Sequence, residues 1–292
     1  MIYVMTKLNL DGKPSSTDAG ASTAKQKVDG KPSSTDAGAS TAKQKAPKYE
    51  NGTQGFLLIL RCSNNKAVSA ADAEALKKFF PEKHYIHQDN DCESIDDMIA
   101  NLGKAKQTLK TEKDIYCFVC AILGNGHKGI IDLTEGEYKI EEIRKTFNND
   151  LDSPYFTGRP KVFLIQAGQG YNLQKSSIKF VDSEIAVHVD ADALIAYAST
   201  PDYAAFESDK GSYFIQTCVE VFKSKHSSCH LEEMMVIVKE QMSCYRFRLK
   251  EPLQQADVRD VRDKKHPYYG TFTQMPCVWT TLTRFLYFKS PD

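Results

Sequence analysis

The chain has 292 residues, of which 41% are hydrophobic and 26% are charged, as in an average soluble globular protein. Lys and Arg together number 38, as do Asp and Glu, so no net charge favours binding to nucleic acid or anionic lipid. No apolar run approaches the ~20 residues of a membrane span and Met1–Leu10 lacks the pattern of a secretory leader, so we expect a cytoplasmic protein.

The N-terminal segment contains a tandem repeat. Asp11–Lys27 is repeated residue for residue as Asp29–Lys45, an offset of 18 positions. The repeated unit is rich in Ser, Thr, Ala, Gly, Lys and Asp, and it has almost no apolar surface to bury. We therefore predict that residues 1–53 form a disordered leader, acting as a flexible tether, and that residues 54–292 form the globular domain.

From residue 54 onward, apolar strands alternate with amphipathic helices. Strands are predicted at Gly55–Leu60, Ile115–Leu123, Lys161–Gln166, Ala191–Tyr197 and Cys277–Phe288. Helices are predicted at Ala70–Phe80, Ile95–Leu109, Tyr138–Phe147, Gly211–Lys223 and Leu231–Tyr245. This alternation favours an α/β sandwich around a mostly parallel sheet. The functional site of such a sheet lies beyond the carboxyl ends of its strands, here on the loops Gly124–Gly129 and Ala167–Gly170.

The eight cysteines are scattered through apolar surroundings without the spacing of a disulfide framework, which favours free thiols. Cys117 and Cys120 have redox or zinc spacing, but they lie in a predicted buried strand, where packing is the better interpretation. His226, Cys229 and His230 lack a second pair of ligands at zinc-finger spacing. We therefore expect no metal and no cofactor.

Two loops resemble those of the caspases. Lys161–Gly170 (KVFLIQAGQG) resembles the loop of the caspase nucleophile, which has the signature Q-A-C-[RQG]-G. Cys117–Ile131 resembles the strand and loop that present the caspase histidine. Further matches occur in family order: Arg61–Lys66, Asp72–Phe80, Ala196–Tyr203, Gly211–Gln216 and Gln274–Phe288.

The resemblance extends from Gly55 to Phe288. It implies a caspase-like three-layer α/β/α sandwich around a mostly parallel six-stranded sheet. It also divides the domain into a part like the large subunit (54–170), a short linker (171–190) and a part like the small subunit (191–292). Asp182 in the linker is a candidate processing position, although we expect the chain to stay intact.

Both catalytic positions implied by the resemblance are degenerate. Gly168 stands at the nucleophile position, and glycine has no side chain to attack a carbonyl. Asn125 stands at the histidine position, and an amide cannot act as a general base near neutral pH. Gly168 follows Asn125 by 43 positions, which fits the family spacing of ~50. We therefore expect the chain not to be an enzyme.

A relocated pair, Cys120 and His127, is an alternative. His127 lies two positions from Asn125, which moves a side chain by about 6–7 Å in an extended backbone. A misplacement of ~1 Å already costs about 100-fold in rate.

The pocket that holds the substrate aspartate in caspases is also changed. Gln166 is retained, but the loop that carries one arginine, between Lys66 and Asp72, is deleted. The second arginine should follow an aromatic residue, and here Phe206 is followed by Glu207. A carboxylate at that position repels the carboxylate that caspases bind.

The terminal strand implies a partner. In caspases this strand joins two sheets at a two-fold axis, and Val278, Thr280, Leu282 and Phe285 would contribute here. We therefore expect a catalytically dead homologue that regulates an active caspase, in apoptosis or immune proteolysis, as a heterodimer or as a homodimer. The sequence leaves open whether it activates or inhibits. It also leaves open a strand covered within a monomer.

Two other functions remain as alternatives. The first is residual cysteine-type endopeptidase activity. The second is a module that binds peptides without cutting them, with a preference for basic peptides because of Glu207. An open groove around Gly168 would favour peptide binding, whereas a collapsed one would favour a purely dimerising role.

Overall fold

The computed structural model describes residues 3–7, 47–49, 52–148, 156, 158–170, 191–249 and 272–289. All the described residues belong to one compact unit, and residues 9–46 lie outside the described part. No helix among the described residues has the length and apolar character needed to cross a membrane.

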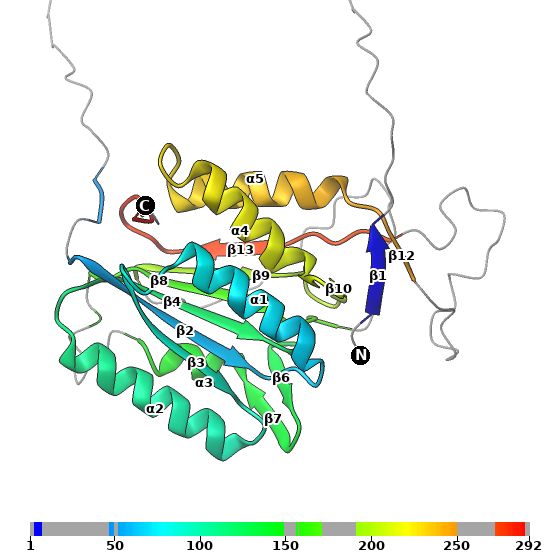
Figure 1. Ribbon diagram of the computed structural model, residues 1–292, viewed down its shortest axis with the longest axis horizontal. Coiled ribbons are helices and arrows are strands. Elements are labelled where there is room, and N and C mark those ends of the chain that lie inside the picture. The colour runs from blue at the N-terminus through cyan, green and yellow to red at the C-terminus, as the bar shows by residue number, and fades with distance from the viewer. Residues whose placement is uncertain are drawn as a thin grey trace, which may run out of the picture. The chain divides into compact units, whose positions relative to one another are not determined.

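A six-stranded sheet forms the centre of the domain (Figure 1). Its spatial order is β13 (Cys277–Thr280), β9 (Ala193–Tyr197), β8 (Lys161–Gln166), β4 (Ile115–Leu123), β2 (Gln54–Arg61) and β3 (Tyr85–Asp91). All neighbouring strands run parallel except β13, which is antiparallel to β9 and lies at the edge. The predicted mostly parallel, six-stranded sheet is confirmed.

Helices cover both faces of this sheet (Figure 1). They are α1 (Lys66–Phe79), α2 (Ile95–Thr111), α3 (Ile140–Lys145), α4 (Tyr213–Lys225) and α5 (Leu231–Cys244). Side chains of β2 alternate between the faces, so that Leu57 packs with α1, α4 and α5 whereas Phe56 packs with α2 and α3. Each strand buried on both faces therefore reads as a continuous apolar run.

Local signals explain where the helices begin and end. Ser94 and Asp97 form a capping box at the start of α2, in which each side chain bonds the other's backbone N–H. Helix α1 ends just before Pro81, as predicted. It begins at Lys66, four residues before the predicted start, because Val68 and Ser69 already belong to its buried face.

Two smaller sheets flank the central one. The first contains β5 (Asn125–His127), β6 (Ile130–Leu133) and β7 (Gly136–Lys139), in a segment expected to be a turn and the start of a helix. Lys128 and Gly129 join β5 to β6, and both have positive φ, +45° and +79°. Positive φ at both residues is typical of a two-residue type I′ hairpin turn.

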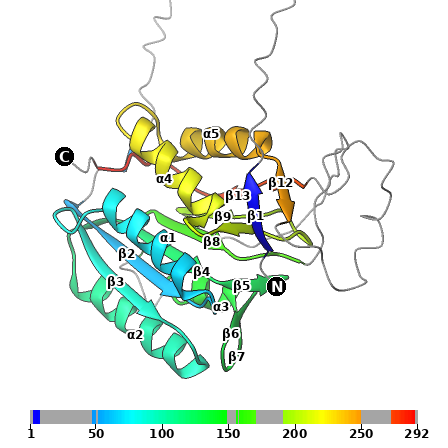
Figure 2. The same ribbon diagram turned by 45° about the vertical axis from the view of Figure 1, so that its right-hand side comes forward.

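The second small sheet has the order β11 (Gly211–Ser212), β10 (Phe206–Ser208), β1 (Tyr3–Lys7) and β12 (Phe247–Leu249). Figure 2 shows β1 beside β12. This strand lies inside the predicted disordered leader, 1–53, so that prediction is wrong at Tyr3–Lys7. The short alternating segment finds its hydrogen-bond partners only in residues far along the chain. The tandem repeat, the linker 171–190 and Asp182 lie outside the described residues.

The terminal strand is also shorter than predicted. The segment 277–288 is strand only over Cys277–Thr280. Beyond Thr281 the backbone leaves the sheet, and Phe285 exchanges hydrogen bonds with the segment 47–49, through the Phe285 N–H to Pro47 O (2.9 Å) and the Tyr49 N–H to Phe285 O (3.2 Å). Apolar side chains at 282–288 therefore pack under α1, α4 and α5 rather than on the edge strand.

Candidate functional site

The two predicted loops meet because β4 and β8 are parallel neighbours that end at the same level. Leu123 pairs with Gln166, and the Gly124 N–H donates to Gln166 O at 2.9 Å. Further out, the Lys128 N–H donates to Gln169 O at 3.1 Å. The loops that follow β4 and β8 thus form one site at the carboxyl end of the sheet.

Four glycines of this site differ in how much space surrounds them. A Cβ on Gly124 would lie 2.9 Å from Cys62 Cβ, and one on Gly126 would lie 2.2 Å from Ile130 O. At Gly170 the nearest atom, Asp202 O, would also be 2.2 Å away. These three glycines are required by close packing.

Gly168 is the exception. A Cβ there would find Gly126 O as its nearest neighbour, at 3.3 Å, and Gly170 O at 3.5 Å. Its φ is not in the left-handed region, so an L-residue would not strain the backbone. A Cβ at the nucleophile position implied by the resemblance would therefore be a close but tolerable fit, unlike one at the other three glycines.

Asn125 lies in β5, opposite Asp132 of β6. Its Oδ1 is buried, as is the Oε1 of Gln166, and neither oxygen accepts a hydrogen bond within the described part of the chain. Both side chains border a hollow of about 10 Å³, together with Gly124, Gly126, Gly168, Gly170 and Ala205. That volume is at the lower limit for one water molecule, so the described residues leave little room beside Gly168.

The thiols of β4 lie away from this hollow. Cys117 packs on the side of α1, α4 and α5, whereas Cys120 packs on the side of α2. They point to opposite faces of the sheet and cannot share a metal ion or form a disulfide. Burial raises the pKa of Cys117 to about 12 and also raises that of Cys120. Cys120 is fully buried, and His127 lies beside Asp132, with Nδ1 and Oδ1 3.2 Å apart.

Glu207 is buried with only 3% of its surface exposed. Its Oε1 accepts a hydrogen bond from Asn65 Nδ2 at 2.8 Å, and burial raises the pKa of its carboxyl group. Phe206 is buried against Phe247, with ring centroids 5.0 Å apart. The position where the resemblance implies an arginine thus holds a buried carboxylate that accepts a hydrogen bond from Asn65.

Asp72 of α1 is a second buried carboxylate beside Glu207. It accepts hydrogen bonds from the Ser212 N–H at 3.0 Å and from Gln216 Nε2 at 2.7 Å. Burial raises the pKa of Asp72 to about 7, and the charge of Glu207 adds to the shift. Sequence reasoning did not single out Asp72 or Asn65. The signal for Asp72 is an acidic residue on the apolar face of a helix.

The free edge of β10 is taken by the chain's own N-terminal strand. Tyr3 pairs with Phe206 and Val4 pairs with Glu207, in a parallel register. A peptide that adds a strand to this edge would have to displace β1.

The candidate dimer strand, β13, presents an edge to its outside. The Thr281 N–H donates to Ala193 O at 2.7 Å, and Thr281 O accepts from the Asp192 N–H at 3.0 Å. Because main-chain groups alternate along an antiparallel strand, those of Val278 and Thr280 point away from β9. Leu282 and Phe285 lie beyond the strand, and Phe285 is stacked on His230, with ring centroids 4.1 Å apart.

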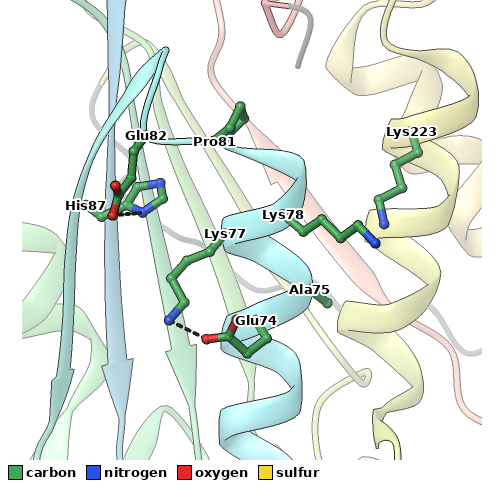
Figure 3. Close-up of a pocket in the computed structure, with 8 residues that line it drawn as sticks. All are labelled: Glu74, Ala75, Lys77, Lys78, Pro81, Glu82, His87 and Lys223. Carbon is green, nitrogen blue, oxygen red and sulfur yellow. Dashed lines mark ion pairs between the residues drawn. The ribbon is translucent and has the colours of Figure 1, made fainter. Parts of the chain in front are cut away.

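A larger hollow, of about 720 Å³, is lined mainly by α1, with Glu82 and His87 on one side of the helix and Lys223 of α4 on the other (Figure 3). Lys77 in its wall forms ion pairs with Glu74 and with Asp89. Lys78 and Lys223 extend toward one another from the two helices (Figure 3). None of the predicted site residues lines this hollow.

Comparisons with known proteins agree with the geometry. The family profile described as Caspase domain matches residues 54–287. Caspase-3 of Bos taurus is 28% identical over 226 residues, which are 74% of this chain and 75% of that protein. Caspase-7 of Gallus gallus is 29% identical over 216 residues, 70% of this chain and 63% of that protein. The crystal structure of caspase-1 from Spodoptera frugiperda has a TM-score of 0.64 at 20% identity, covering 85% of this chain and 96% of that chain. The predicted caspase-like fold is confirmed.

Proposed function

The chain belongs to the caspase family, and from that premise we propose that it is a catalytically inactive member that regulates an active caspase by dimerisation. The observation that carries the proposal is Gly168, which leaves the nucleophile position without a side chain. Asn125, at the base position, adds an amide that cannot accept a proton near neutral pH.

The pocket supports the same proposal independently. Glu207 is buried, bonded to Asn65 and flanked by β1, so this position offers a carboxylate rather than a cationic group to a substrate aspartate. A variant with a restored thiol would still lack the means to bind an aspartyl peptide.

Neither alternative function gains support. Residual hydrolysis would need a thiolate, and the relocated candidate, Cys120, is fully buried with a raised pKa. Peptide binding would need a groove, and the hollow beside Gly168 has room for about one water molecule.

The edge of β13 supports the dimerising part of the proposal. Val278 and Thr280 direct their main-chain groups outward, and an edge strand of this kind is a template for a second chain. A partner caspase bound there could have its active conformation stabilised or trapped, according to which state binds better.

The test is co-expression with the active caspases of the same organism, followed by size-exclusion chromatography and assay of the partner. We expect a heterodimer in which hydrolysis of an aspartyl peptide per active subunit differs from that of the partner alone. Only monomers and homodimers, with unchanged partner activity, would contradict the regulatory role. Hydrolysis by the isolated chain that a thiol blocker abolishes would contradict its inactivity.

A further inference from the structure

The sheet of β5, β6 and β7 gathers three side chains that can bind a metal ion. Asp132 pairs across the strands with Asn125 on one side and with Glu137 on the other. Directly paired residues point to the same face of a sheet. His127 points to the same face as Asn125, because side chains two positions apart in a strand lie on one face. Strand register alone thus places His127, Asp132 and Glu137 on one face.

The distances suit a shared ion. One ligand atom from each of the three residues lies within 4.8 Å of the others, and His127 Nδ1 is already 3.2 Å from Asp132 Oδ1. Ligands at ~2.1 Å from a tetrahedral ion are roughly 3.4 Å apart. The Glu137 side chain is exposed, so a change of its rotamer can bring its carboxylate closer to the other two ligand atoms.

The charge balance of this face favours a cation. Two carboxylates directly opposite one another on neighbouring strands repel. Within the described part of the chain, neither Asp132 nor Glu137 forms an ion pair with a lysine or an arginine. A bound cation would relieve the repulsion between them.

We propose that His127, Asp132 and Glu137 form a binding site for a divalent transition-metal ion, for which Zn²⁺ is the best-fitting candidate. One imidazole nitrogen and two carboxylate oxygens match the ligand preference of Zn²⁺, whereas Mg²⁺ and Ca²⁺ prefer oxygen ligands alone. The type I′ turn at Lys128 and Gly129 fixes the hairpin and so holds His127 in place. No metal was predicted from the sequence. The three residues become neighbours only through strand pairing, which their spacing along the chain does not reveal.

The site has three protein ligands and leaves a coordination position open. It lies on the strand that carries Asn125, and the Lys128 N–H ties the same hairpin to Gln169 of the opposite loop. Metal binding would therefore restrict the motion of the β5–β6 hairpin that borders the hollow beside Gly168. It does not depend on whether the chain regulates a caspase.

The test is titration of the reduced, metal-free full-length protein with Zn²⁺ against a chromophoric chelator. Glu137→Gln and Asp132→Asn should each weaken the site at least tenfold. Glu135→Gln, which changes an exposed glutamate in the neighbouring turn, should bind as the wild type does. Zn²⁺ should raise the melting temperature of the wild type and of Glu135→Gln, but not that of Glu137→Gln.

Co²⁺ distinguishes this site from adventitious binding at cysteines. Co²⁺ bound by one imidazole and two carboxylates should give weak visible absorption bands. It should not give the near-ultraviolet charge-transfer absorption of a Co²⁺–thiolate complex. The proposal is overturned by absent binding, by equal Zn²⁺ affinity in all four proteins, or by a thiolate spectrum for the tight site. Thermal unfolding of each metal-free variant checks that its fold is intact.

Discussion

Asn65 donates a hydrogen bond to Glu207 at 2.8 Å, linking the loop before α1 to β10 across 142 positions of sequence. This bond allows a carboxylate to lie buried where the resemblance to caspases implies an arginine, because a buried polar group needs a partner. The position that would hold an arginine in the substrate pocket is therefore occupied by a buried, hydrogen-bonded carboxylate.

Removing the donor should therefore destabilise the fold. We expect Asn65→Ala to lower the free energy of unfolding by about 1–3 kcal/mol, because Glu207 would be left buried without this hydrogen bond. Asn64→Ala, a neighbouring change at an exposed residue, should cost no more than about 0.5 kcal/mol. Urea unfolding at neutral pH compares the two variants, and equal stabilities would show that the bond contributes nothing.

The buried carboxylate of Asp72 should make stability depend on pH. Its pKa is about 7 in the folded protein, against an ordinary value of 3.8, so between these pH values only the folded state holds the proton. The free energy of unfolding should therefore fall as pH rises from about 4 to 7, by at most ~1.4 kcal/mol per pH unit, and then level off. The raised pKa of Glu207 acts in the same direction.

Asp72→Asn should flatten this dependence, whereas Asp96→Asn, at an exposed aspartate in α2, should leave it in place. Urea unfolding at four pH values between 5 and 8 measures the slope. If the slope of Asp72→Asn equals that of the wild type, the dependence arises elsewhere.

The glycines of the two loops should respond differently to a methyl group. Gly168→Ala should change stability by no more than about 1 kcal/mol, because its Cβ meets nothing closer than 3.3 Å. Gly170→Ala should cost roughly 2–4 kcal/mol, since its Cβ would lie 2.2 Å from Asp202 O and the backbone must shift. Differential scanning calorimetry of both variants checks the order, and a reversed order would refute the assigned packing.

The outer edge of β13 can be blocked without disturbing its inner edge. Thr280→Pro removes an N–H that points away from β9, so we expect an intact fold and at least a tenfold weaker association with the dimer partner. Thr280→Val keeps the N–H but loses the hydroxyl that accepts from the Leu282 N–H, and it should associate normally. Sedimentation velocity distinguishes these outcomes, and unchanged association of Thr280→Pro would place the interface elsewhere.

Strands with both faces buried could be predicted closely from the sequence. Ile115–Leu123 and Lys161–Gln166 have the same bounds in the structure as in the prediction, because continuous apolar runs mark such strands. The predicted terminal strand extended too far beyond Thr280. The apolar residues that follow are buried because they pack beneath helices, not because they belong to the sheet. Apolar composition does not distinguish the two kinds of burial.

The candidate site also contains features that could be predicted from the sequence and features that could not. Asn125 and Gly168 were found by motif, because the motif has fixed spacing along the chain. The hydrogen bond between Asn65 and Glu207 could not be predicted from the sequence, because it joins segments that only the folded structure brings together. Pairing of β1 with β10 was missed for the same reason.

The residues at Gly168 and Glu207 differ in how many changes would be needed to restore the residues that the resemblance to caspases implies there. Glycine and cysteine codons can differ by a single base, so one mutation could place a thiol at position 168, where a Cβ would lie 3.3 Å from Gly126 O. The inward carboxylate at Glu207, held by Asn65 and bordered by β1, would need several coordinated changes to revert. Under the proposed function, a return to proteolysis would therefore depend more on the surroundings of Glu207 than on a sulfur at position 168.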